Sequence, residues 1–249
     1  MEDHRSKRIK VVNRMFMDAE HSFSLLKFYY NEITELLHGR AADFRKFTDK
    51  VEKEHRESQR SFDKESWLKH YDVYSEYYPN IFSNSFIVST CALFEFHIRK
   101  ICNLVKEEHR VPLEWDDMRG SVPTRTKSFL WHGGIIIRDD PPTIVLPPPD
   151  FVPTEIFDEK RFIADELWQD IENYFRVRNC IAHHGGTISR MRYQRRISEY
   201  ASARGILIEN NDQKELKISH DFNKEVCDVM MKFFSKLMGA YYSTPLPDD

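Results

Sequence analysis

The chain has 249 residues, enough to bury a hydrophobic core as one large domain or two small ones. Hydrophobic residues make up 41% of it and charged residues 31%, which is typical of a soluble globular protein. The formal net charge of −3 argues against a protein that coats nucleic acid non-specifically, so any contact with RNA must come from a local basic patch.

The four cysteines stand singly within helical patterns, and the sequence has no Cys-x-x-Cys pair. This spacing predicts neither a zinc site nor a disulfide framework, and it favours a reducing cytoplasm. The N-terminal residues are polar with no apolar segment behind them, and the longest apolar stretch, residues 81–96, is interrupted by serine, asparagine and Glu95. We therefore expect no signal peptide and no membrane span.

Three helices are predicted in the first half of the chain. Residues 8–38 carry apolar side chains at helical spacing, which predicts a first helix that ends near Gly39. Residues 41–76 are more polar and carry alternating charges, which predicts a long exposed second helix with Asp63 as a candidate break. Residues 81–109 are apolar on most sides, and a helix with this pattern belongs at the centre of a bundle.

The helical pattern stops between residues 111 and 153, where prolines are concentrated. This Pro-rich arm is far longer than a usual bundle loop, so it is either a disordered segment or a functional arm. Its aromatic residues favour packing, for example against a second subunit, and residues 134–137 have a strand-like pattern. A further helix is predicted over residues 154–184.

The last part of the chain predicts a hairpin followed by a helix. Residues 204–219 have the pattern of two short strands with a turn at residues 210–213. The final helix covers residues 221–242, with Asp221 as its N-cap. The sequence thus predicts an all-α fold with a single domain over residues 1–249. We expect an up-and-down bundle of about five helices into which a small β-hairpin and a long Pro-rich loop are inserted.

The end of the helix over residues 154–184 carries an arginine, Arg178, in its apolar row. A guanidinium on a core-directed face is costly unless a carboxylate, a partner subunit or a ligand phosphate pairs with it. His183 follows five residues later, which on a straight helix turns it about 140° away from Arg178. Gly185–Gly186 predicts a helix end, where His183 in the last turn could reach the same cavity.

These residues also have structural interpretations. Arg178 can be an ion-pair residue of the core, and His183 can cap the C-terminus of its helix. Glu95 on the central helix can form a solvated ion pair with Arg99, four residues later, or it can be the buried partner of Arg178.

The sequence Arg178-Asn179-x-x-x-His183 resembles the R-x4–6-H motif of the HEPN superfamily, in which a polar residue follows the arginine. The resemblance implies a metal-independent endoribonuclease that needs no cofactor and acts as a homodimer, with both copies of the motif in one cleft. Arg178 would hold the scissile phosphate, and His183 would transfer protons as the ribose 2′-hydroxyl attacks. The products would be a 2′,3′-cyclic phosphate and a 5′-hydroxyl. Asn179 would orient the phosphate or the histidine, and Glu95 would support Arg178.

RNA is the expected partner of this site. Contacts to its backbone are expected from a run of arginines, although such a run is also typical of a solvated loop face. These arginines are Arg176, Arg190, Arg192, Arg195 and Arg196. The resemblance further implies a cytoplasmic toxin or antiviral defence protein with a possible antitoxin or defence partner. Gly185 stands where HEPN toxins that pair with a nucleotidyltransferase antitoxin often have a tyrosine, which argues against tyrosine-directed neutralisation.

Two other functions compete with the nuclease. A non-catalytic HEPN-like module could bind RNA or nucleotide, or serve dimerisation, with the same residues. Two Glu-x-x-His pairs, Glu35/His38 and Glu52/His55, are typical of di-iron bundle proteins. They lie about 24 Å apart along helical structure, however, so they cannot share a metal and no metal site is expected.

Overall fold

The structure is a computed structural model. The residues that it describes are 4–57, 68–69, 71–135, 166–191, 194–210 and 213–244. Within them the fold is all-α with one small hairpin, as the sequence predicts. The six described α-helices are α1 (His4–Glu57), α3 (Tyr78–Glu108), α4 (Val122–His132), α5 (Glu166–His184), α6 (Gln194–Ala203) and α7 (His220–Ser243).

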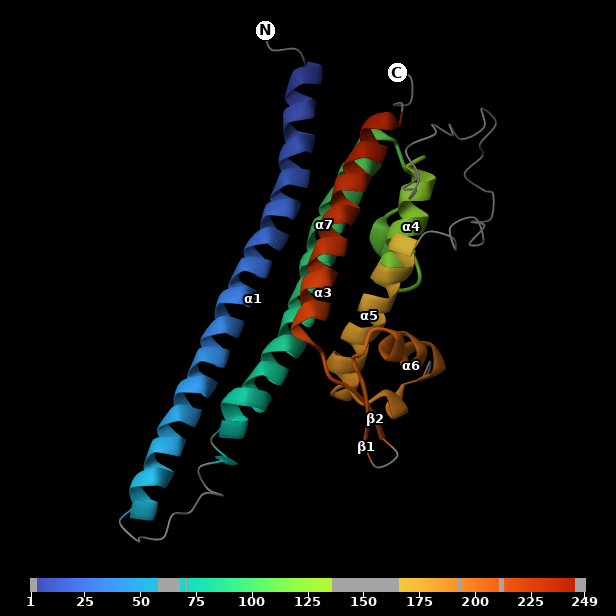
Figure 1. Ribbon diagram of the computed structural model, residues 1–249. Helices are drawn as coiled ribbons and strands as arrows, with labels where there is room; N and C mark the ends of the chain where they lie inside the picture. Colours follow the sequence, from blue (N-terminus) through green and yellow to red (C-terminus); the bar gives the residue numbers. More distant parts are fainter. Residues whose placement is uncertain are drawn as a thin grey trace.

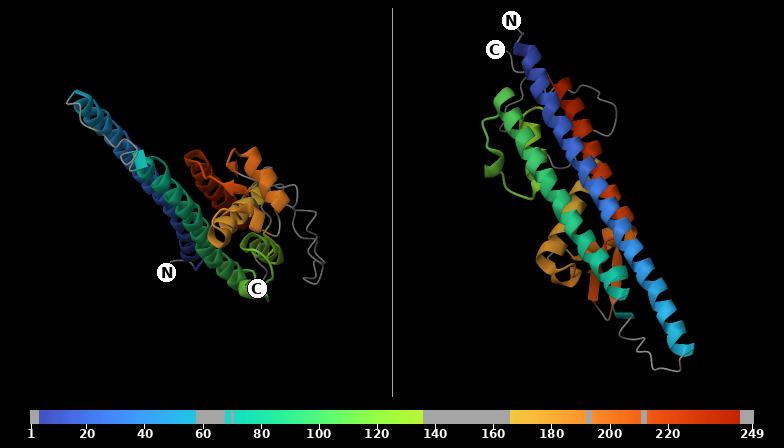
Figure 2. Two further views of the ribbon diagram at one scale, coloured as in Figure 1. Left: turned by 90° about the horizontal axis from the view of Figure 1, so that it is seen from below. Right: turned by 90° about the vertical axis from the view of Figure 1, so that its left-hand side faces the viewer.

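The helices form three layers (Figure 1). The middle layer consists of α3 and α7, which contact each other. α1 lies across one face of this pair, as the two further views also show (Figure 2). α5 packs on the opposite face, with α4 and α6 beside it. The start of α1 and the end of α7 lie at the same end of the molecule. The central layer therefore separates α1 from the helix that carries the predicted motif.

α1 is a single helix of 54 residues where the sequence predicts two. At 1.5 Å per residue it is about 80 Å long. Gly39 lies inside it and does not have a positive φ, so the predicted helix end at Gly39 is wrong. The predicted separate helix over residues 41–76 is wrong as well, because residues 41–57 belong to α1. The candidate break at Asp63 lies outside the described residues.

The buried face of α1 explains why the helix continues past the glycine. Thr34, Ala41 and Thr48 are all buried, and they are spaced seven residues apart. A spacing of seven keeps side chains on one face of a helix. The buried face that begins with Val12 and Phe16 thus continues past Gly39, and no new helix starts there.

α3 is the central helix, as predicted. It follows directly on a π-helical turn, Val73–Tyr77, and it contacts α1, α5 and α7. The ring of Phe94 lies 5.7 Å from that of Phe175 on α5, and 5.1 and 5.4 Å from those of Phe233 and Phe234 on α7. These aromatic contacts join the middle layer to the motif helix.

By length and composition alone, residues 73–108 could cross a membrane. Of the most apolar window in this range, 44% is buried inside the protein. The packing of α3 against four other helices, α1, α4, α5 and α7, is the environment expected for a core helix. The prediction that the protein has no membrane partner stays a prediction.

Two helices occur where none is predicted. α4 lies inside the predicted Pro-rich arm, so the statement that helical structure stops at residue 111 is wrong for residues 122–132. Its N-cap is Ser121, whose side chain accepts a hydrogen bond from the amide of Thr124 at 3.4 Å. α6 lies in the run of arginines, and its buried side chains are Ile197 and Ala201. Residues 136–165, including the second part of the arm and the predicted start of the motif helix, lie outside the described residues.

The predicted hairpin and last helix are confirmed. β1 (Leu207–Asn210) and β2 (Gln213–Leu216) form an antiparallel pair in which Leu207 lies opposite Leu216. The N-cap of α7 is Ser219, whose hydroxyl accepts a hydrogen bond from the amide of Phe222 at 3.1 Å, so the assignment of this cap to Asp221 is wrong. Asp221 lies in the first turn, where a carboxylate is favoured by the helix dipole. The described part of Gly134–Ile137, residues 134–135, is not a strand.

Candidate functional site

α5 presents a row of apolar side chains to the core and carries the motif at its C-terminal end. Leu167, Ile171 and Tyr174 are buried, as the predicted stripe requires. Arg178 lies in the same row and is half-buried. The guanidinium is therefore held at the edge of the core, where it is less hydrated than on an open surface.

α5 ends at His184, as predicted. Gly185 and Gly186 have φ values of 60° and 86°, a region that residues with a side chain rarely adopt. The amide of Gly185 donates to the carbonyl oxygen of Ile181, and the amide of Gly186 donates to that of Cys180, both at 3.1 Å. These bonds satisfy two of the last carbonyl groups of the helix and turn the chain away from its axis.

Arg178 has unused hydrogen-bonding capacity. Its Nη1 donates to Oδ1 of Asn179 at 2.9 Å. Its Nε is buried and has no hydrogen-bond partner among the described residues. Within the same part of the chain no carboxylate forms an ion pair with this guanidinium. The positive charge is thus not neutralised by a carboxylate in this part of the chain, and the guanidinium keeps donor capacity beyond its bond to Asn179.

His183 is exposed in the last turn of α5. The helix stays regular to His184, so the rotation of about 140° between Arg178 and His183 is kept within one chain. No hydrogen bond joins these two side chains among the described residues. Asn179 lies four residues before His183, on the same side of the helix. The structure brings Arg178 and Asn179 together and leaves His183 one turn further on.

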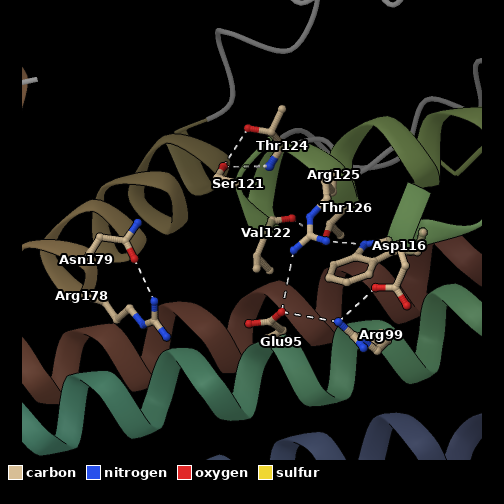
Figure 3. A network of polar contacts seen from close by, with 11 residues as sticks. Glu95, Arg99, Asp116, Ser121, Val122, Thr124, Arg125, Thr126, Arg178 and Asn179 are labelled. Carbon is tan, nitrogen blue, oxygen red and sulfur yellow. Dashed lines mark hydrogen bonds and ion pairs between the residues drawn. The ribbon is translucent and has the colours of Figure 1, made fainter. Parts of the chain in front are cut away.

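Glu95 is not the ion-pair partner of Arg178. Its Oε1 lies 3.7 Å from Nη2 of Arg99 and 3.8 Å from Nη2 of Arg125. Figure 3 shows this arrangement, with Arg178 bonded to Asn179 and no interaction drawn between Arg178 and Glu95. Two partners for Glu95 are predicted from the sequence, Arg99 and Arg178. The structure contains the ion pair with Arg99 and no ion pair with Arg178.

Sequence reasoning missed Arg125, because this residue lies in the arm for which no helix is predicted. On α4, its guanidinium carbon lies 4.1 Å from the ring centroid of Trp115, and that of Arg99 lies 4.9 Å from the same centroid. The indole N–H donates to Oγ1 of Thr126 at 3.3 Å. Nε of Arg125 is buried and has no partner among the described residues. A second guanidinium with an unpartnered Nε therefore lies on the α4 side of Glu95 (Figure 3).

The predicted RNA-binding arginines have different environments. Arg176 is already engaged, because it pairs with Glu172 at 3.0 Å and donates to Asn173 at 2.6 Å. Arg195 pairs with Glu199 at 2.7 Å on the surface of α6. The remaining described arginines, Arg190 and Arg196, are exposed. Arg192 lies outside the described residues.

A separate ionic cluster fixes α5 against its neighbours. Nη2 of Arg204 lies 2.9 Å from Oδ1 of Asp170 on α5, and its Nη1 also pairs with Glu225 on α7. The hydroxyl of Tyr174 donates to the same Glu225 carboxylate at 3.0 Å. This cluster uses its charges internally, so Arg204 has a structural role.

The thiols near the motif are not activated. Burial raises the pKa of the Cys180 thiol to about 11. Burial also raises the pKa of the Cys91 thiol, and the charge of Arg178 opposes that shift only in part. Both side chains are therefore protonated near neutral pH, and neither is suited to act as a nucleophile.

No group of three or more His, Cys, Asp or Glu side chains that could hold a metal occurs in the described part of the chain. Both Glu-x-x-His pairs lie on α1, still about 25 Å apart.

No protein-family model matches the chain, and comparisons with curated proteins and with solved structures find no match. The HEPN resemblance therefore depends on the motif and on its place at the end of α5.

Proposed function

We propose that the protein is an HEPN-type, metal-independent endoribonuclease that acts as a homodimer on single-stranded or loop RNA. The observation that supports this most is the state of Arg178, a half-buried guanidinium with an unpartnered Nε and no carboxylate paired with it among the described residues. A guanidinium at the edge of the core without an opposite charge is costly, and a phosphate of RNA would supply that charge.

The other motif residues have the chemistry that this reaction needs. His183 is exposed, so it can reach a substrate, and an imidazole can transfer protons near neutral pH. It would take the proton of the ribose 2′-hydroxyl or donate one to the leaving 5′-oxygen. Asn179 already holds the guanidinium of Arg178 and would fix its orientation toward the phosphate. The nucleophile belongs to the RNA, so the reaction ends with a 2′,3′-cyclic phosphate and a 5′-hydroxyl.

A dimer would resolve the separation of Arg178 and His183 along α5. Within one chain the two side chains point in different directions around the helix. Two α5 helices facing each other across a twofold axis would place His183 of one protomer near Arg178 of the other. The dimer is thus part of the proposed mechanism, since the site would be incomplete in a single chain.

The first experiment measures cleavage of a single-stranded RNA in the presence of EDTA. The wild type is expected to cut it, and Arg178→Ala and His183→Ala are each expected to lose about 100-fold or more in rate. Arg178→Lys keeps the positive charge but lacks the planar fork of the guanidinium, so it should recover only part of the lost cleavage rate. His184→Ala is the matched control, because it removes the neighbouring imidazole from the same helix turn. Equal activity in His183→Ala and His184→Ala would contradict the assigned role of His183.

A second experiment tests the dimeric site. Arg178→Ala and His183→Ala chains are mixed so that hybrid dimers form. In a hybrid, one Arg178 and one His183 remain, and they belong to opposite protomers. If the site combines residues across the twofold axis, the mixture regains activity that neither variant has alone. If both residues act within one chain, the mixture stays inactive although hybrid dimers are detected.

A second function is favoured by one observation. Arg178 is bonded to its own neighbour Asn179 and has no contact with His183, an arrangement that suits a non-catalytic module for binding RNA or nucleotide. This alternative predicts RNA binding by the wild type that is lost in Arg178→Ala, with no cutting by either protein. A setting in bacterial defence, an antitoxin partner and a cytoplasmic location are further parts of the proposal that derive from the resemblance.

A further inference from the structure

α1 carries a second apolar face besides the one that packs in the core. Four large apolar side chains near the middle of the helix are between 38% and 60% exposed, namely Leu25, Tyr29, Ile33 and Leu36. They are spaced three or four residues apart, so they are neighbours on the helix surface. In the right-hand view of Figure 2, α1 lies in front of the other helices. A contiguous apolar patch on a protein surface indicates that something binds there.

This second face is turned away from α7. Lys27 of α1 pairs with Asp228 of α7 at 2.5 Å, and the hydroxyl of Ser24 donates to Sδ of Met231 at 3.4 Å. The two residues from Lys27 to Tyr29 turn the helix by about 200°, so Tyr29 lies on nearly the opposite side. The contacts that hold α1 against α7 therefore leave the second apolar face uncovered.

The second apolar face continues as a straight seam along α1. Residues spaced by eleven stay on one side of a helix, because eleven residues make close to three turns. Three such rows lie side by side here: Val11, Ser22 and Ile33; Arg14, Leu25 and Leu36; and Asp18, Tyr29 and Arg40. Ser22 is half-buried, and the other eight side chains are exposed. We call these nine residues, together with the exposed Asp43, the α1 seam.

The charges of the α1 seam occur in opposite order on the two sides of Tyr29. Toward the N-terminus an acid, Asp18, comes first and a base, Arg14, comes second. Toward the C-terminus a base, Arg40, comes first and an acid, Asp43, comes second. Asp18 and Arg40 both lie eleven residues from Tyr29. None of these four charged side chains forms an ion pair within the part of the chain that the structure describes.

We propose that the α1 seam binds a second copy of this chain, with the two α1 helices antiparallel and a twofold axis at Tyr29. In this arrangement Asp18 of each protomer lies opposite Arg40 of the partner subunit, which gives two ion pairs across the axis. Arg14 and Asp43 come within one residue of the same register and form two more. A parallel pair of helices would instead place Asp18 against Asp18, so the order of the charges selects the antiparallel arrangement.

The apolar residues of the α1 seam fit the same arrangement. Leu25 of one protomer lies opposite Ile33 of the partner subunit, and Tyr29 meets its own copy at the axis. A helix that lies on a membrane surface carries mainly basic residues beside its apolar face. The α1 seam has one acid and one base on each side of its apolar centre, which suits a copy of itself better than a lipid surface.

The size of the contact is sufficient for a specific but weak dimer. Paired over residues 11–47, the two helices run together for about 54 Å. With a contact strip about 10 Å wide, the two partners together bury about 1,100 Å², close to the lower limit for a specific interface. The α1 seam and α5 lie on opposite sides of the central layer, so this contact is separate from the one proposed for the nuclease. A chain that makes both contacts forms particles larger than a dimer.

The experiment measures particle mass by sedimentation of the wild type and of Asp18→Arg and Arg40→Asp. Each single variant places like charges opposite each other at two positions, so association through the α1 seam should weaken about 10-fold or more. In a 1:1 mixture of the two variants, one chain carries both positive charges and the other both negative charges. Mixed pairs should therefore regain the mass of the wild type. The double variant Asp18→Arg/Arg40→Asp should regain it as well, because its ion pairs are only reversed.

The matched control for charge reversal is Asp49→Arg. Asp49 is an exposed acid of α1 that lies nine residues after Arg40, which turns it about 180° away from the α1 seam. This variant should have the particle mass of the wild type. The proposal is overturned if the wild type is a monomer, if neither single variant changes the mass, or if the mixture does not regain the mass that the single variants lose. RNA cleavage is not the readout, so this proposal and the nuclease succeed or fail separately.

A thiol crosslink tests the position of the axis. Tyr29→Cys places two thiols next to each other across the twofold axis, and a short thiol-specific crosslinker should join the two chains. Met17→Cys is the control, because Met17 is 65% exposed on the same helix but would lie about 36 Å from its copy. The four natural cysteines are all buried, so they should not react. Equal crosslinking through positions 29 and 17 would contradict the antiparallel arrangement.

Discussion

α1 and α5 both carry glycine within a helical pattern, yet only α5 ends there. Gly39 of α1 has helical residues on both sides, and the helix continues for eighteen residues to Glu57. Gly185 and Gly186 have positive φ values, and α5 stops at His184. A glycine permits the left-handed conformation that ends a helix, but it does not impose it.

The residues after each glycine decide whether the helix ends. After Gly39, Ala41 and Thr48 continue the buried face of α1, so the helix gains by extending. After Gly186, Thr187 forms a β-bridge with Glu215 of β2, so the chain must leave the helix axis. Helix termination is thus set by the next tertiary contact, which a local pattern does not contain.

Both sides contain buried polar atoms without a hydrogen-bond partner among the described residues. Around α1 these include Oδ1 of Asn31, and Oδ1 of Asn223 although the Nδ2 of that residue donates to Tyr30. On the α5 side, Nε of Arg178 has no partner. The α5 side differs in charge, because its unpartnered group belongs to a guanidinium, and burying a charged group without an opposite charge costs more than burying an amide oxygen.

The largest effect is expected from the double substitution Gly185→Ala/Gly186→Ala. Each alanine must adopt a left-handed conformation that costs about 1–2 kcal/mol, so the free energy of unfolding should fall by about 2–4 kcal/mol. Urea unfolding followed by circular dichroism measures this change. Gly239→Ala is the control, because Gly239 lies inside α7 with no atom within 4 Å of an added Cβ. A double variant as stable as the wild type would show that α5 can end without the left-handed turn.

This contrast also explains which parts of the fold the sequence predicts. α3 and α7 are predictable because their apolar side chains recur at helical spacing over many turns. α4 is not, because Pro123 also fits the pattern of a proline-rich loop. A proline in the first turn, such as Pro123 two residues after the capping Ser121, is instead a common way to begin a helix. α6 is hidden by its arginines, since only Ile197 and Ala201 are buried.

The candidate site is predictable only where it is local. Arg178 and Asn179 are neighbours in the chain, and the two glycines mark the end of α5, so their arrangement can be derived from the sequence. The partner of Glu95 depends on which helix packs beside α3, and the structure places Arg125 there from a helix that the sequence does not predict. Pairwise contacts between distant elements require the tertiary arrangement, which periodicity in a single sequence does not specify.

A change of intermediate size is expected in the pH dependence of stability, through the packing of α1 on α3. Burial lowers the pKa of His97 below its ordinary value of 6.5, with Lys100 acting in the same direction and Asp18 in the opposite one. The unfolded chain therefore binds this proton more tightly than the folded chain. The stability that neutral His97 contributes is present above pH 6.5 and is lost as the pH falls toward the folded pKa.

His97→Phe tests this contribution, because the imidazole lies among the rings of Phe23, Phe96 and Phe234. Urea unfolding is measured above and below the ordinary histidine pKa, at about pH 7.5 and about pH 5.5. The loss of unfolding free energy between the two should be smaller in the variant. Burial also lowers the pKa of His132 and of His220, so the loss should not vanish. An equal loss in both proteins would mean that His97 is protonated as easily in the folded chain as in the unfolded one.

The smallest effect is expected at Gly39. An added Cβ there meets no atom within 4 Å, and the residue lies inside a continuous helix. Gly39→Ala should therefore raise the free energy of unfolding by about 0.5–1 kcal/mol, because alanine loses less conformational entropy than glycine when it becomes helical. If a helix ended at this position in solution, as the sequence alone suggests, the same substitution would instead lower stability by straining a left-handed turn. The sign of this change, compared with that at Gly185 and Gly186 in the same urea titration, decides between one long α1 and two helices.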